Sequence, residues 1–187
     1  MVATPSTMLP LGTPAPDFEL PDTFGATHTL DEIAGTAPAM VVMFLSNHCP
    51  YVKHIGRELG LVTQRFLRRG VAVVGIMSND VDAYPDDAPP LMAVTARSYG
   101  WDFPYLYDES QDVARDYHAA CTPDLFVFDA ERRLAYRGQF DGARPSNDVP
   151  VTGADLRAAV DAILAGGSPT DDQIPSLGCN IKWRVGS

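Results

Sequence analysis

The sequence has few cysteines and few basic residues, and each shortage excludes a class of protein. Only 3 of the 187 residues are cysteine, too few for the disulfide framework of a small secreted domain, and the odd number leaves at least one thiol outside any internal pair. The 14 basic residues face 24 acidic ones, and a net charge of −10 repels phosphate backbones and anionic lipids. We therefore expect neither nucleic acid nor a membrane as a partner.

The sequence also lacks a long hydrophobic run. No stretch approaches the roughly 18 apolar residues of a membrane span, and prolines interrupt residues 1–18 where a signal peptide needs a basic start and an apolar stretch. These features predict a soluble, untargeted protein of the cytoplasm. The length and the 45% hydrophobic content predict a single domain over residues 1–187, with a core of about 12–165 and an aperiodic C-terminal tail over 166–187.

What is present is a strand, a turn, a helix and a second strand. Residues 39–45 are apolar throughout, which indicates a strand covered on both faces in the middle of a mostly parallel sheet. Pro50 suits the first turn of a helix, and apolar residues then recur at three- and four-residue steps until Gly70. Residues 71–77 form the second apolar run, so we expect a right-handed β-α-β unit.

The other elements are predicted from turn and capping patterns. The polar turn 129–133 between two short apolar runs is typical of a β-hairpin. The acidic, proline-rich loop 78–90 is expected to be exposed. Thr152 to Asp155 match a capping box that opens a final helix. The remaining expectations are an extended entry over 11–22, helices near 91–99 and 110–117, and surface positions for Asp141, Arg144 and Asp148.

Cys49 carries the strongest chemical signal, because the sequence places it where a helix begins. A cysteine there faces unpaired backbone N–H groups and the positive end of the helix dipole, and both favour the thiolate over the thiol. Lys53 lies one turn further on, His48 is adjacent, and the Ser46 hydroxyl is a possible hydrogen-bond donor. The sequence thus favours a reactive thiol at Cys49 over a buried structural cysteine.

Three segments carry a family resemblance: the entry 15–21, the apolar strand before Cys49 and residues 122–129. Through these segments the chain resembles, from about residue 12 to 164, the redoxin branch of the thioredoxin superfamily, the group that contains AhpC/TSA-type peroxiredoxins and thioredoxin-like oxidoreductases. It implies an α/β thioredoxin-like fold, with a central mixed sheet flanked by helices. It also implies a cis proline at Pro123 beside the cysteine helix.

Two departures separate this chain from the better-known members of the superfamily. Thioredoxin-type exchange uses a C-x-x-C pair, whereas the first position here is Ser46. Peroxiredoxins have T/S-x-x-C, which Ser46 and Cys49 match, but Val42 stands where their proline is expected. Their arginine near the cis-proline position is also missing, because Pro123 stands there.

The leading hypothesis is a thiol-disulfide oxidoreductase in which the Cys49 thiolate attacks an oxidised sulfur, and Cys121 or an external thiol regenerates it. Cys121 is either this resolving thiol or a small apolar filler, and Cys179 in the tail is favoured as a bystander over a second resolving cysteine. No bound cofactor is expected. The candidate catalytic residues are Cys49 and Cys121, and the candidate substrate-binding residues are Ser46, His48, Thr122 and Pro123.

Two alternatives remain open at the level of sequence. One is a thiol peroxidase that reduces hydroperoxides at Cys49. The other is a non-catalytic copper carrier built from Cys49, His48 and Cys121, because sulfur and imidazole are suitable copper ligands. The expected partners of the enzymatic forms are small disulfides, peroxides or protein thiols, together with an external thiol reductant.

Overall fold

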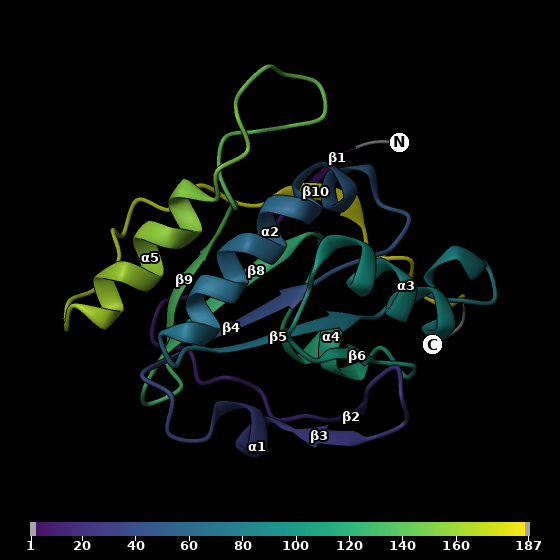
Figure 1. Ribbon diagram of the computed structural model, residues 1–187, viewed down its shortest axis with the longest axis horizontal. Helices are drawn as coiled ribbons and strands as arrows, with labels where there is room; N and C mark the ends of the chain where they lie inside the picture. The colour runs from purple at the N-terminus through teal and green to yellow at the C-terminus, as the bar shows by residue number, and fades with distance from the viewer. Residues whose placement is uncertain (1–2, 186–187) are drawn as a thin grey trace.

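A five-stranded mixed sheet forms the centre of the protein, and the computed structural model describes residues 3–185 (Figure 1). The strand order is β6-β5-β4-β8-β9. At the centre, β4 (Ala39–Phe44) pairs in parallel with β5 (Ala72–Met77) and antiparallel with β8 (Asp124–Asp129). The edges are β6 (Tyr105–Tyr107) and β9 (Leu134–Gly138). This arrangement confirms the predicted mixed sheet, the β-α-β unit and the hairpin.

Helices cover both faces of the sheet because β4 is apolar on both sides. Its odd-numbered residues lie in one apolar cluster with residues of α2 (Pro50–Arg68), α3 (Pro89–Tyr99) and α5 (Ala154–Leu164). Its even-numbered residues lie in a second cluster with α1 (Leu30–Ala34) and α4 (Asp112–Asp116). A strand buried on both faces is what the continuous apolar run predicts. Figure 1 shows α2 in front of the sheet and α5 beside it, next to β9.

Helix α2 packs closely against the end of α3 and against Trp101. A Cβ atom at Gly60 would lie 2.3 Å from the carbonyl oxygen of Tyr99, so only glycine allows α2 to approach the end of α3 this closely. The indole N–H of Trp101 donates to the carbonyl of Gly56 at 2.8 Å. The middle of α2 is therefore packed closely against the end of α3 and the residues that follow it. No helix among residues 3–185 has the length and apolar character needed to cross a bilayer.

The start of α5 differs from the sequence prediction. Gly153, not Thr152, is the N-cap residue, and no side chain caps the helix. The backbone N–H groups of both residues instead donate to one carboxylate oxygen of Asp141, each at 2.6 Å. The predicted capping box is therefore wrong, and so is the predicted surface position of Asp141, which is buried. A carboxylate from earlier in the same loop serves the same purpose as a cap, because it accepts from otherwise unpaired N–H groups.

The predicted tail folds back onto the core. Its strand β10 (Leu177–Asn180) lies between β1 (Ala3–Pro5) and β7 (Cys121–Thr122) and is antiparallel to both. Figure 1 shows β1 and β10 side by side near the first turn of α2. The remaining elements are the hairpin strands β2 (Glu19–Pro21) and β3 (Thr27–Thr29) and the short 3₁₀-helix η1 (Pro85–Asp87).

Candidate functional site

Cys49 is the N-cap residue of α2, as the sequence predicts for this position. Its carbonyl accepts the first helical hydrogen bond, from the N–H of Lys53 at 2.9 Å. The Cys49 side chain is fully buried, with 0% of its surface exposed. The thiol is thus held at the positive end of a 19-residue helix and is shielded from solvent.

The sulfur of Cys49 contacts two groups from other parts of the chain. Its Sγ atom lies 3.0 Å from the carbonyl oxygen of Thr122 and 3.0 Å from the Sγ atom of Cys179. The Thr122–Pro123 peptide bond is cis, which confirms the expectation from the family resemblance. The helix start, the cis-proline strand and β10 therefore meet at one point.

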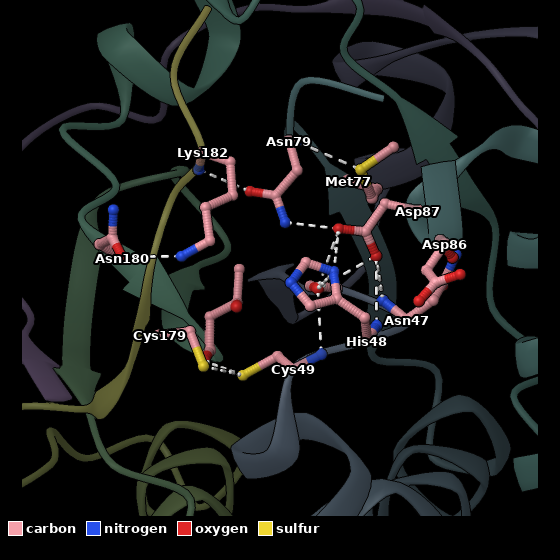
Figure 2. A network of polar contacts seen from close by, with 12 residues as sticks. Asn47, His48, Cys49, Met77, Asn79, Asp86, Asp87, Cys179, Asn180 and Lys182 are labelled. Carbon is pink, nitrogen blue, oxygen red and sulfur yellow. Dashed lines mark hydrogen bonds and ion pairs between the residues drawn. The ribbon is translucent and has the colours of Figure 1, made fainter. Parts of the chain in front are cut away.

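The position of Cys179 differs from the expectation for a bystander. Cys179 opposes Thr122 in the pairing of β10 with β7, and its sulfur faces that of Cys49 (Figure 2). Burial, with a further contribution from the neighbouring Cys49, raises the pKa of the Cys179 thiol to about 12. Nothing in the local pattern of the tail signalled this contact, since it joins residues 130 positions apart.

Cys121, the candidate resolving thiol, lies one residue further along the same strand pair. It opposes Asn180, is fully buried, and its sulfur lies 3.5 Å from the carbonyl oxygen of Pro123. Burial, followed by the charge of Asp124, raises the pKa of the Cys121 thiol well above its usual value. The strand group that contacts the Cys49 sulfur is therefore the carbonyl of Thr122, whereas the Cys121 sulfur contacts the carbonyl of Pro123.

Asp87 is a site residue that the sequence analysis missed. The loop 78–90 was expected to be exposed, but this carboxylate is fully buried and lies against the turn before Cys49 (Figure 2). It accepts from the N–H of Asn47 at 2.6 Å, and it lies 2.8 Å from Nδ1 of His48. Burial acts to raise the pKa of Asp87, but the hydrogen bonds from His48 and Asn79 and the charge of His48 outweigh it and lower that pKa below its usual value.

Ser46 and His48 act on the turn and not on the sulfur. The Ser46 hydroxyl donates to both carboxylate oxygens of Asp87, each at 3.1 Å, and its oxygen accepts from the N–H of Cys49 at 3.3 Å. The His48 ring stacks on that of Tyr84, with centroids 5.5 Å apart. These contacts fix the backbone that presents Cys49. Lys53, proposed from sequence as a cationic neighbour, has an exposed side chain.

The same carboxylate is connected to the C-terminal segment. Asn79 donates from Nδ2 to Asp87 at 2.6 Å and accepts at Oδ1 from the N–H of Lys182 at 2.8 Å. Lys182 follows β10, so one buried amide connects the segment that carries Cys179 to the turn that carries Cys49 (Figure 2). Satisfied buried networks of this kind fix the relative position of the parts they join.

A small hollow lies beside the cis proline. Its volume is about 20 Å³, enough for a water molecule. Arg144 lines it, and the guanidinium donates to the carbonyl oxygens of Asp141 and Ala143, each at 2.7 Å. The other lining residues are Tyr51, His54, Ile55, Pro123, Gln139, Phe140, Asp141, Ala143, Pro145, Ser176 and Leu177.

The copper-carrier alternative requires a preformed group of metal ligands. Within residues 3–185, no group of three or more histidine, cysteine, aspartate or glutamate side chains is arranged to hold a metal ion. The Nδ1 atom of His48 is already engaged by Asp87, and Cys121 has Pro123 as its sulfur contact.

The family follows from residues 11–137, which match the model of the AhpC/TSA family. The chain belongs to the AhpC/TSA family. This AhpC/TSA protein has the thioredoxin-like fold, and its group consists generally of thiol-based oxidoreductases. No curated protein matches it.

Two solved structures resemble this AhpC/TSA protein over its whole length. A hypothetical protein from Sinorhizobium meliloti 1021 is 51% identical, with a TM-score of 0.95, and the match covers 98% of this chain and 100% of that one. An uncharacterized conserved protein from Geobacillus kaustophilus is 46% identical, with a TM-score of 0.96 and coverage of 100% and 99%.

A more distant structure shows the fold alone. A thiol:disulfide interchange protein of the thioredoxin family from Chlorobium tepidum TLS is 20% identical, with a TM-score of 0.62. The match covers 84% of this chain and 99% of that one.

Proposed function

We propose that this AhpC/TSA protein is a thiol-disulfide oxidoreductase that uses Cys49 as its nucleophile. The observation that carries the proposal is the placement of the Cys49 sulfur at the start of α2, 3.0 Å from the Thr122 carbonyl oxygen and 3.0 Å from a second sulfur. A helix N-terminus stabilises thiolate, and a neighbouring thiol allows a disulfide to form without a metal or an organic cofactor.

The reaction proceeds by two thiol-disulfide exchanges. The Cys49 thiolate attacks one sulfur of a substrate disulfide, forming a mixed disulfide, and the other substrate sulfur leaves as a thiolate that takes up a proton. A second thiol then loses its proton and attacks the Cys49 sulfur, which releases the remaining substrate thiol. The substrate gains two electrons and two protons, the protein holds the new disulfide, and an external thiol reductant returns it to the dithiol form.

Replacing Cys49 with serine is expected to abolish this exchange, because a hydroxyl at the same position is not a thiolate nucleophile. The reduced protein is mixed with oxidised glutathione, and the release of reduced glutathione is followed with time. Cys121→Ser is the matched control, since it removes an equally buried thiol and is expected to retain the first exchange step. Equal rates for the parent and for Cys49→Ser would refute the proposed nucleophile.

Replacing Ser46 with cysteine is expected to create a local C-x-x-C pair that accelerates the reduction of insulin disulfides by dithiothreitol. Ser46 already accepts the Cys49 N–H at 3.3 Å, so a sulfur at this position lies beside the same turn. Turbidity from precipitating insulin chains gives the rate. Ser46→Ala is the control for losing the hydroxyl without gaining a thiol, and equal rates for the two variants count against a thioredoxin-like turn.

The substrate class and the location are parts of the same proposal. Small disulfides or protein disulfides are favoured over peroxides, because Pro123 stands where peroxiredoxins carry an arginine. A cytoplasmic location is supported by the three cysteines, all within residues 3–185, none of which forms a disulfide in the structure. Cell fractionation with an antibody against the protein tests the location.

A further inference from the structure

Strand β10 occupies the strand position beside the cis proline. Cys179 opposes Thr122 in this pairing, so the chain's own backbone pairs with a residue that the sequence analysis assigned to substrate binding. The fit requires a glycine next to the cysteine. A Cβ atom at Gly178 would lie 2.0 Å from the Thr122 carbonyl oxygen, a distance that no side chain tolerates.

The two sulfurs are placed for bond formation. Their separation of 3.0 Å compares with about 2.05 Å in a disulfide, so a movement of roughly 1 Å joins them. Both are shielded, with 0% of Cys49 and 3% of Cys179 exposed. A substrate disulfide therefore reaches Cys49 only when a covering segment moves, and β10 is the segment whose side chain contacts the Cys49 sulfur.

Strand β10 is paired along both edges. It opposes β1 at three positions and β7 at two. Beyond its ends, the N–H of Ser6 donates to the carbonyl of Ser176 at 2.8 Å, the N–H of Ile181 donates to the carbonyl of Ala120 at 3.2 Å, and the Lys182 N–H donates to Asn79. With four residues, β10 has fewer paired positions to break than the six-residue central strand β4.

We propose that Cys179 is the resolving thiol of the Cys49 reaction. Strand β10 moves away from Cys49 to admit the substrate disulfide, and it then moves back so that Cys179 releases the remaining substrate thiol. This inference rests on the proposed function. After Cys49 has formed a mixed disulfide, the returning Cys179 loses its proton and attacks the Cys49 sulfur. The Cys49–Cys179 bond forms, the bond to the substrate breaks, and the substrate sulfur leaves as a thiol after taking up the proton.

The test maps the disulfide that forms on oxidation. Reduced protein is treated with oxidised glutathione, remaining thiols are blocked with N-ethylmaleimide, and the cross-linked and glutathione-bearing peptides are identified by mass spectrometry. The parent protein and Cys121→Ser are expected to yield a Cys49–Cys179 cross-link and no lasting glutathione adduct. Cys179→Ser is expected to retain glutathione on Cys49.

The outcomes separate this inference from the proposed function. A Cys49–Cys121 cross-link in the parent, or glutathione retained on Cys49 equally in the parent and in Cys179→Ser, overturns the role of Cys179 and leaves Cys49 as the nucleophile. Absence of glutathione from Cys49 in both proteins, with no cross-link, overturns the proposed function itself. If Cys179→Ser fails to fold, the cross-link identified in the parent protein still tests the role of Cys179.

Discussion

Hydrogen peroxide is expected to oxidise Cys49 at least about a hundredfold more slowly than it oxidises a peroxiredoxin that retains its active-site arginine. Peroxide reduction needs a donor that stabilises charge developing on the leaving oxygen, and removing one such donor costs on the order of a hundredfold or more in rate. Pro123 occupies the arginine position here. Stopped-flow mixing of both reduced proteins with peroxide measures the difference.

Arg137 and Arg144 differ in their ability to replace the missing donor. Arg137 is fully buried, forms an ion pair with Asp124 at 3.1 Å and lies over the ring of Phe126. Arg144 lines the hollow beside Pro123 and is partly exposed. Fast peroxide consumption that Cys49→Ser abolishes would reject the preference for disulfides, and loss of that activity in Arg144→Gln would identify the substitute donor.

Replacing Asp87 with alanine is expected to lower the free energy of unfolding by about 3 kcal/mol, since it leaves buried donors without an acceptor. These donors include the N–H of Asn47 at 2.6 Å and the side-chain amide of Asn79 at 2.6 Å. Urea denaturation of both proteins gives the difference. Asp86→Ala is the control, because Asp86 is the exposed neighbour whose backbone carbonyl alone contacts Asn47.

The effect of Asp87 is also expected to depend on pH. Its pKa is lowered in the folded protein, so the stability it contributes is complete above the unfolded value of about 3.9 and is lost as the pH falls through the folded value. The stability difference between the parent and Asp87→Ala should therefore narrow on acidification below about pH 4. A difference that stays constant through that range would contradict the role assigned to this carboxylate.

Much of the fold could be predicted from the sequence because the signals are local. Uninterrupted apolar runs predicted β4 and β5, and the spacing of apolar residues predicted α2. A polar turn between short apolar runs predicted the β8–β9 hairpin. The placement of Cys49 at a helix start follows from the residues on either side of it. Each of these features depends on residues within about one helix length of one another.

The tertiary structure alone decided which groups surround Cys49. Asp87 is 40 residues from Asn47, and Cys179 is 130 residues from Cys49, so no local sequence pattern predicts either contact. By composition, Asp87 and Asp141 are indistinguishable from surface carboxylates. Each accepts backbone N–H groups in its buried position, Asp87 from a distant segment and Asp141 from the end of its own loop. Similarly, the aperiodic tail becomes a strand because β1 and β7 supply hydrogen-bonding partners on both of its edges. The sequence determined the position of Cys49 at a helix start, and the fold determined the carboxylate that holds the turn before it and the thiol that faces it.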